Sequence, residues 1–547
     1  MSRPRASSRG LLRGLLRPAA AGVVLALPLA GAAAARAAER GAWWSDGLRW
    51  LTLDAGVWWF DRLAPACAGV LVVLALAWRW WRGRARRPPR AAARGRGAAV
   101  AALLRAAAAI VPPVPDGPNV VLVSIDTLRA DGLGAYGNPR PTSPTFDARL
   151  AAEGVLFSDV LSQAPKTTPS HMTMLTGVYP AVHGVTMWEG ATAEPVLNPR
   201  LHTLAELLRN AGWRTVAFTD GGPMHASRGF EHGFEVYRHT KPLARAQRWI
   251  AGNAGGRRPV FLFFHSFEIH DPYTPPPGWI DQFDPDYRGP ILDAVRAIRR
   301  GAENWEQAHA LFWKDVDPTD PRAVAFVHRL YEAGIRHMDD LTLARLLADL
   351  AARDPRRETL VVFTSDHGEA FAEHGAFLHD DLWRHTLHVP LVLRWPGRLP
   401  AGLRIDAPVR LLDLTPTILD LVGVPAPAYV QGRSLVPLLR GAPLPPQPVV
   451  SEHGPPHRTP RFQSLRLDGH TLLLLGDHMQ LFDLAADPGE RVDRAAADPA
   501  LVARLRAELD RWQAECARLA ARLGPEGAGV APPPDVMRQL RALGYVE

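Results

Sequence analysis

The sequence predicts an α/β protein built on a mostly parallel β-sheet that is sandwiched by helices. Short, nearly uninterrupted apolar runs at 120–125, 214–218, 260–264, 360–363 and 389–393 alternate with helical patterns. A strand that is covered on both faces is typically a continuous apolar run, whereas a half-exposed strand alternates. From about residue 447 the pattern changes to short strands, which predicts a small antiparallel subdomain at the C-terminal end.

The segments between these runs predict the remaining elements in order. We expect a helix over 203–210, with Gly212 beyond its end, and a longer helix within 325–350. Two strands at 462–467 and 471–475 are joined by Asp468-Gly469, a dipeptide that favours a tight turn. A helix at 499–521 would pack on this hairpin. The expected domains are 1–117, 118–446 and 447–547.

Polar residues follow two of the apolar runs. Asp126 closes the first run, and Asp366-His367 come just after the run at 360–363. Ligands of open α/β sheets gather where strands end, so the two segments are predicted to meet at one point. The alternative for Asp126 is a turn residue, and for Asp366-His367 a strand end with a solvated histidine.

A third segment, Thr167-Thr168-Pro169-Ser170-His171, opens a helical pattern that ends at Gly177. Thr168 is the expected helix cap, which places Thr167 beside a helix N-terminus. The N–H groups and dipole there favour an oxyanion such as phosphate or sulfate. A divalent cation could stabilise the alkoxide of Thr167 and make it a nucleophile, although a lone threonine here is more often a cap.

Several segments in order resemble the sulfatase family of the alkaline phosphatase superfamily, over about residues 118–545. They are Ile125 to Asp131, Thr167 to Gly177 with Tyr179-Pro180 and His183-Gly184, His270 to Tyr273, Ser365 to Glu369, Gln431 to Leu435, and Leu481 to Leu484 with Asp487 to Glu490.

The resemblance implies a function for single residues. It makes Asp126, Asp366 and His367 ligands of one divalent metal ion, which would be Zn, Mn, Mg or Ca, and makes Thr167 the nucleophile that also touches the metal. His171, His270 and His379 fall where family members contact the nucleophile or the substrate oxyanion, and His374 lies close by. Thr127 stands where many members place another carboxylate.

One departure from the family concerns the nucleophile. Sulfatases proper carry Cys or Ser there and convert it to formylglycine, and Thr167 cannot be converted. Neither Cys67 nor Cys516 can replace it, and the lysines that clamp sulfate are missing, since Lys occurs only at 166, 241 and 314. A threonine resembles the phosphotransferases and phosphodiesterases of the superfamily, so we expect phosphorus rather than sulfur.

The expected function is therefore that of a metal-dependent, sulfatase-like hydrolase of sulfuric or phosphoric esters that acts through a covalent intermediate on Thr167. Its ester substrate would be linked to a lipid or a glycan. One alternative is a membrane transferase of the phosphoethanolamine or phosphoglycerol type. The other is a membrane scaffold without catalytic activity.

The N-terminal region predicts a multi-pass anchor in the cell membrane. Apolar stretches lie at 18–35 and 63–78, and a weaker one at 98–114 is interrupted by Arg105. By the positive-inside rule, two spans leave the main domain in the cytosol and three export it. We expect three, because such family members usually act outside the cytoplasmic membrane. An interfacial helix at 98–111 is the alternative.

Charge is concentrated in the same N-terminal region. Residues 1–117 hold 18 arginines and 5 acidic residues, a local balance of +13, whereas the whole chain carries +8 and the remainder therefore about −5. Binding of nucleic acid would need a basic folded face with aromatic stacking partners, and the sequence shows no such pattern. We therefore expect no nucleic-acid partner.

Overall fold

The computed structural model describes residues 117–186, 194–253, 256, 258–353, 359–454, 462–524 and 527–530. The apolar stretches at 18–35, 63–78 and 98–114 lie outside these residues, so the membrane anchor stays a prediction. Within the described ranges, every helix is too short or too polar to cross a membrane.

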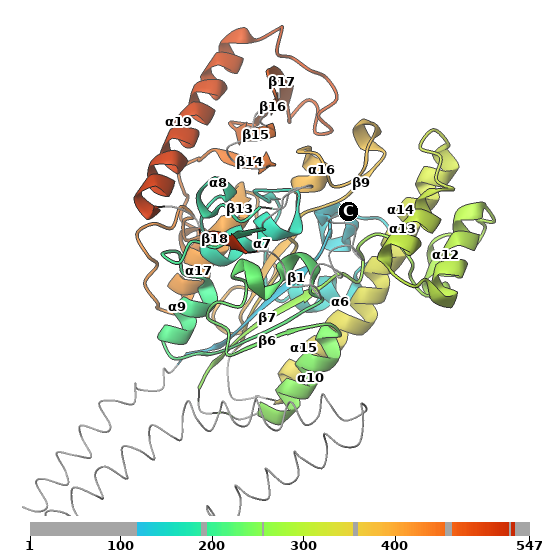
Figure 1. The fold of residues 1–547 in the computed structure, drawn as a ribbon, viewed down its shortest axis with the longest axis horizontal. Helices are drawn as coiled ribbons and strands as arrows, with labels where there is room; N and C mark the ends of the chain where they lie inside the picture. The colour runs from blue at the N-terminus through green and yellow to red at the C-terminus, as the bar shows by residue number, and fades with distance from the viewer. Residues whose placement is uncertain are drawn as a thin grey trace, which may run out of the picture. The chain divides into compact units, whose positions relative to one another are not determined.

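The main sheet has eight strands in the order β12-β2-β11-β8-β1-β7-β5-β6 (Figure 1). Of these eight, β11 runs antiparallel to its neighbours β8 and β2, and the other pairings are parallel. The predicted, mostly parallel sheet is therefore confirmed. Its strands are β1 (Asn119–Ile125), β2 (Val155–Phe157), β5 (Arg214–Thr219), β6 (Val236–His239), β7 (Val260–Ser266), β8 (Thr359–Thr364), β11 (Leu391–Arg394) and β12 (Leu403–Ile405).

One strand boundary differs from the prediction. The apolar run at 389–393 predicted a strand from residue 389, but β11 begins at Leu391. Pro390 has no N–H group to donate to a neighbouring strand, which explains why the ladder starts after it. Val389 instead donates its N–H to the carbonyl of Val160, 3.0 Å away.

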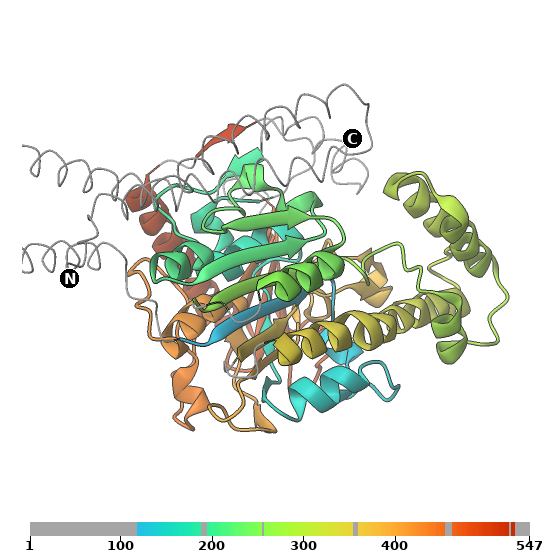
Figure 2. The same cartoon turned by 90° about the horizontal axis from the view of Figure 1, so that it is seen from below.

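Helices cover both faces of the main sheet, as Figure 2 shows from below. Alternate side chains of β1 enter two different cores: Val120 and Leu122 pack on one face, Val121 and Val123 on the other. The first core contains α7 (Thr167–Thr176), α8 (Pro180–His183), α9 (Leu204–Asn210), α17 (Leu414–Leu421), α18 (Val436–Leu439) and α19 (Pro499–Leu523). The second contains α6 (Pro144–Phe146), α10 (Pro242–Asn253), α14 (Pro321–His337) and α15 (Ala344–Arg353), with a π-helical stretch, Met338–Leu343, between the last two.

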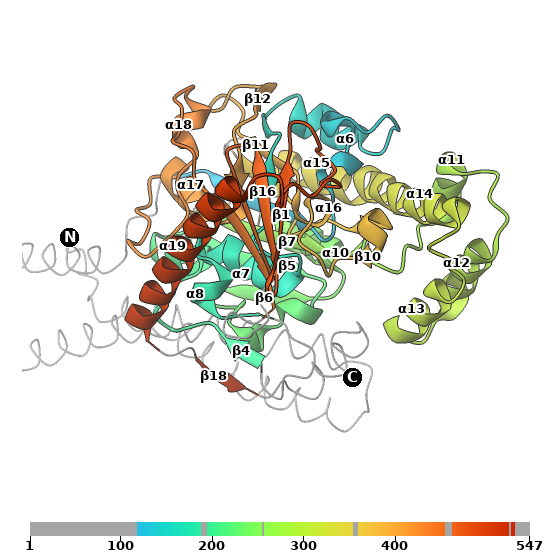
Figure 3. The ribbon, with the colours of Figure 1, turned by 90° about the horizontal axis from the view of Figure 1, so that it is seen from above.

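Three helices are inserted between β7 and α14. They are α11 (Pro277–Phe283), α12 (Pro290–Gly301) and α13 (Trp305–Trp313). Figures 1 and 3 both show α12 and α13 standing out at the side of the sheet. The sequence prediction did not include this insertion.

The predicted C-terminal antiparallel layer is also confirmed. Four strands pair in sequence order, β14 (Val449–His453), β15 (Phe462–Leu467), β16 (His470–Leu475) and β17 (His478–Asp483), and α19 packs against β15 and β16. Shorter elements complete the described chain: α16 (Arg384–Leu387) and the strand pairs β3 (Val160–Leu161) with β13 (Val409–Arg410), β9 (Ala370–Phe371) with β10 (Phe377–Leu378), and β4 (Glu194–Val196) with β18 (Gly527–Val530).

A capping box starts α9, within the helix that the sequence predicted. The Thr203 hydroxyl accepts a hydrogen bond from the Glu206 N–H at 3.2 Å, and the Glu206 carboxylate accepts one from the Thr203 N–H at 3.0 Å. We expect Thr203→Ala to lower the free energy of unfolding by about 1 kcal/mol in a urea titration. Thr203→Ser keeps the hydroxyl and should lose less; equal losses would show that the cap contributes nothing.

Candidate metal and nucleophile site

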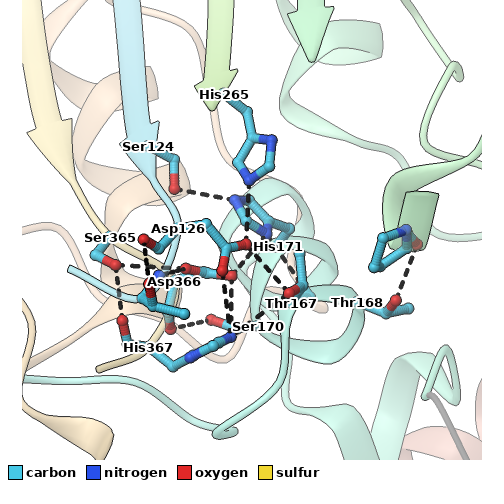
Figure 4. Close-up of polar contacts among 12 residues, drawn as sticks. Ser124, Asp126, Thr167, Thr168, Ser170, His171, His265, Ser365, Asp366 and His367 are labelled. Atoms are coloured by element: carbon cyan, nitrogen blue, oxygen red, sulfur yellow. Dashed lines mark hydrogen bonds and ion pairs between the residues drawn. The ribbon is translucent and has the colours of Figure 1, made fainter. Parts of the chain in front are cut away.

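Three adjacent parallel strands aim polar residues at one point (Figure 4). In the sheet order β8-β1-β7, Asp366 and His367 follow β8, Asp126 follows β1, and His265 lies at the end of β7. The turn after β1 is held to β7, because the Asp126 N–H donates to the carbonyl of Ser266 at 3.0 Å. The predicted meeting of the two strand ends is therefore what the structure shows.

Thr167 reaches the same point from the start of α7. Its Oγ1 lies 3.1 Å from Asp126 Oδ2 and 3.5 Å from His367 Nε2. One ligand atom from each of Asp126, Asp366 and His367 lies within 4.8 Å of the other two. All four side chains are at most 1% exposed. The structure thus brings together all four residues that the sequence assigned to the metal.

The chemistry of these residues fits one divalent cation. Asp126 Oδ1 and Asp366 Oδ2 are buried and have no hydrogen-bond partner, although a buried carboxylate oxygen normally has one. His367 donates its Nδ1–H to the carbonyl of Gly368 at 2.9 Å, which leaves the Nε2 lone pair on the side of Thr167 and the carboxylates. Carboxylate, hydroxyl and imidazole ligands suit Zn, Mn or Mg, and oxygen ligands also suit Ca.

The backbone around Thr127 orients the second carboxylate. The Thr127 N–H and the Ser365 hydroxyl both donate to Asp366 Oδ1, each at 3.3 Å. Thr127 has a φ of 57°, an unusual value for a β-branched residue, and its own hydroxyl donates to the carbonyl of Asp126 at 2.7 Å. The Thr127 side chain is therefore turned to the backbone, and the site has no carboxylate at this position.

Helix α7 begins two residues earlier than the predicted cap allows. Lys166, with extended backbone, is the N-cap residue, and Gly177 ends the helix in the left-handed conformation, with a φ of 71°. The prediction that Thr168 caps the helix is wrong. Thr168 lies in the first turn, and its hydroxyl donates to the carbonyl of Pro223 at 2.9 Å, which satisfies it without capping.

His171 lies beneath the nucleophile. It is fully buried, donates from Nδ1 to the backbone carbonyl of Thr167 at 2.9 Å, and has Nε2 2.9 Å from the Ser124 hydroxyl. It therefore contacts the backbone of Thr167 and not its hydroxyl. His171 holds the first turn of α7 against β1.

The sequence prediction missed His265. Its Nε2 lies 3.2 Å from Asp126 Oδ2, its ring centroid lies 4.8 Å from that of His171, and it is fully buried. The available signal was its place directly after the apolar run 260–264, the same signal that singled out Asp126. His265 supports the carboxylate that accepts the hydrogen bond of Thr167.

His379 and His270 extend the site away from the metal ligands. The His379 ring centroid lies 4.4 Å from that of His367 and 5.5 Å from that of His270, so the three rings form a row. His379 is buried and His270 is half-buried. His374 is outside this row: its ring stacks on Trp383 at 3.9 Å, and its Nε2 lies 3.1 Å from the carbonyl of Gly489. The catalytic roles of His270 and His379 stay predictions.

The residue after His270 anchors the inserted helix α13. Asp271 is buried, and its carboxylate accepts a hydrogen bond from Trp313 Nε1 at 2.6 Å and lies 2.6 Å from His309 Nδ1. Trp305 Nε1 donates to the backbone carbonyl of Asp271 at 2.8 Å, and His270 Nδ1 donates to the same oxygen. The insertion is therefore tied to the loop that carries His270.

Burial sets the charges of the site. Burial, together with the charge of Asp366, holds the pKa of Asp126 well above its ordinary value. Burial would also raise the pKa of Asp366, but His367 and His171 outweigh it and hold that pKa below the ordinary value. Burial lowers the pKa values of His367, His270 and His379, so these imidazoles are neutral at pH 7. A divalent cation would offset the remaining carboxylate charge.

Comparison with known proteins agrees with this geometry. The family described as Sulfatase matches residues 118–424, and the family described as N-sulphoglucosamine sulphohydrolase, C-terminal, matches residues 372–515. Steryl-sulfatase of Mus musculus is 29% identical and covers 77% of this chain and 85% of its own length.

Two solved structures share the fold. The structure of a 2-O GAG sulfatase has a TM-score of 0.60 with 21% identity, covering 77% of this chain and 96% of its own. A phosphonate monoester hydrolase of Agrobacterium radiobacter has a TM-score of 0.56 with 21% identity, covering 76% of this chain and all of its own. Together with the family matches, these likenesses cover the whole main sheet.

Removing a ligand side chain should remove the metal. We expect His367→Ala to weaken binding of a divalent cation by about 100-fold or more. Even loss of a residue that only hydrogen-bonds to a metal ligand lowers metal affinity by about 10- to 100-fold. His374→Ala is the matched control, because that ring packs on Trp383 away from the cluster. Each variant is dialysed against increasing concentrations of a chelator, and its metal content is then measured by elemental mass spectrometry. This measurement tests the prediction and identifies the cation. Equal metal content in both variants would contradict the site.

Proposed function

Because this chain belongs to the sulfatase family, we propose that it hydrolyses a sulfate ester through a covalent intermediate on Thr167. The observation that carries the proposal is the position of the Thr167 hydroxyl. It lies at the start of α7, 3.1 Å from Asp126 Oδ2, beside the Asp366 and His367 ligand atoms. A catalytically inactive scaffold would have no need to keep these four buried side chains together.

In the first step, Thr167 Oγ1 attacks the sulfur, the Oγ1–S bond forms, and the bond from sulfur to the leaving oxygen breaks. Asp126 Oδ2 accepts the hydrogen bond of the hydroxyl, which orients Oγ1 and gives its proton a place to go. A divalent metal, when bound by Asp126, Asp366, His367 and Thr167, would stabilise the alkoxide and the charge of the ester oxygens. The N-terminus of α7 favours the same negative charge.

In the second step, water attacks the sulfur of the sulfo-threonine. The bond from sulfur to the water oxygen forms, the bond to Thr167 Oγ1 breaks, and Oγ1 regains a proton as sulfate leaves. His379, in a row with His367 and His270, has an imidazole N–H that it can donate to the leaving oxygen or the oxyanion. The N–H of neutral His270 is used on the Asp271 carbonyl, so His270 would contact the substrate through its Nε2 lone pair. This is the role that the family resemblance gives them.

A phosphate ester is the second candidate substrate. Threonine in place of the convertible Cys or Ser favours it, because a phospho-threonine is released to water without formylglycine chemistry. Steryl-sulfatase of Mus musculus, one of the relatives, is a sulfatase, which favours sulfate over the phosphorus that the threonine alone led us to expect. Nothing in the comparisons favours the phosphoethanolamine- or phosphoglycerol-type transferase.

The identity of the leaving alcohol and the cellular location of the protein are also proposals. A lipid-linked or glycan-linked ester fits the predicted membrane anchor, which would hold the enzyme at the outer side of the cell membrane. The apolar stretches that support this lie outside the described residues.

Thr167→Ala tests the nucleophile. We expect the substitution to lower kcat for 4-nitrophenyl sulfate and for 4-nitrophenyl phosphate by about 10⁴-fold or more, as for other covalent nucleophiles. Metal content should stay near normal, because three ligands remain. Thr167→Ser retains a hydroxyl and should retain measurable turnover.

Mass spectrometry of the peptide that contains Thr167, after rapid quenching, should show a sulfo or phospho adduct in the wild-type protein. The mass of the adduct identifies the transferred group and therefore distinguishes a sulfate ester from a phosphate ester as the substrate. Full activity of Thr167→Ala would refute the nucleophile assignment.

A further inference from the structure

Lys166 directly precedes the nucleophile. It is the N-cap residue of α7, and its Nζ lies 2.5 Å from Asp380 Oδ1. Asp380 is the residue after His379, so this ion pair joins the start of α7 to the segment that carries a site histidine. The Lys166 side chain is 18% exposed, whereas the Asp380 side chain is 64% exposed. The lysine thus lies on the site side of the pair and its partner faces solvent.

The position of this lysine is unusual in a chain that otherwise uses arginine. Lys and Arg together number 63, and only three of these residues are Lys. The two are not equivalent, because an ammonium group is compact and flexible, whereas a guanidinium is a broad planar fork.

Other cations near the site are committed to protein partners. Arg129 binds Asp131 at 2.7 Å and Glu373 at 2.7 Å, and Arg228 binds the Thr168 hydroxyl at 2.7 Å. An ammonium group has three N–H donors, so Lys166 can keep Asp380 and still donate to a further oxygen.

We propose that Lys166 is the cationic residue that binds a non-bridging oxygen of the sulfate or phosphate group as Thr167 attacks it, and that Asp380 is the partner of Lys166 between turnovers. This inference rests on the proposed function for the chemistry, and on the Lys166–Asp380 geometry for the residue. The oxyanion is thereby bound by the residue directly before the nucleophile, in a chain that lacks the lysines expected from the family resemblance.

Oxyanion binding separates this role from a structural one. In the full-length, metal-loaded protein, Lys166→Met should raise the Kd for inorganic sulfate or phosphate by about tenfold or more, as expected for loss of a charge-assisted hydrogen bond. It should also lower kcat/KM for 4-nitrophenyl sulfate by about 100-fold, as when one oxyanion donor is removed. Lys166→Arg keeps the charge and should restore part of both values.

Two further variants complete the design. Asp380→Asn breaks the ion pair but leaves the ammonium group, so it should bind the anions at least as tightly as the wild-type protein. Lys314→Met removes the same charge from an exposed position and should match the wild type. If the ion pair only held the segment after His379 in place, Lys166→Met and Asp380→Asn would lose anion binding equally, and that result would overturn the proposal.

The outcomes also distinguish this inference from the proposed function. If Lys166→Met turned over the ester as fast as the wild-type protein, the inference would be refuted and the proposed function would stand. Anion binding that depends on Lys166, without turnover of any ester, would leave the inference and remove the hydrolase assignment. Binding of neither anion by the wild-type protein would overturn the inference as well. Thermal unfolding identifies a variant that fails to fold, and Lys166→Gln then replaces Lys166→Met.

Discussion

The site depends on the burial of two carboxylates side by side. Asp126 and Asp366 are fully buried, and each keeps one oxygen without a hydrogen bond. Such an arrangement is costly in a folded protein unless a cation completes it. The surrounding structure is built to maintain it: the Thr127 backbone and Ser365 hold Asp366, and His265 and Thr167 hold Asp126. The fold therefore gathers, in the middle of its main sheet, the carboxylates that a divalent cation would bind.

Rigid and adaptable parts of the site come from different elements. The proposed metal ligands stand at the ends of β1 and β8, in the middle of the eight-stranded sheet, where neighbouring strands fix them on both sides. Thr167, the proposed nucleophile, stands on α7, which His171 ties to β1 through Ser124. His270 and His379 lie on loops, where exchange of residues disturbs the core less. This division suits a catalytic centre in which the metal ligands need fixed positions and the residues that contact the rest of the substrate can vary.

Much of this arrangement could be predicted from the sequence, because buried strands leave a continuous apolar signature. That signature located β1 and β8, and the strand-end rule then placed Asp126, Asp366 and His367 at one point. Features that depend on contacts between distant segments left no local pattern. The Thr168 hydroxyl donates to the carbonyl of Pro223, and Lys166 is the N-cap residue in its place. The ion pair of Lys166 with Asp380 joins residues more than two hundred positions apart. His265 could have been found by the rule that found Asp126.

The attachment of α13 to the loop that carries His270 has a mechanical consequence. Trp313 and His309 both meet the side chain of Asp271, and Trp305 meets its backbone. A shift of α13 would therefore reach the loop that carries His270. Lineages could lengthen, shorten or reshape this insertion and so alter the surroundings of His270, while the strand ends that carry Asp126 and Asp366 keep their places in the sheet.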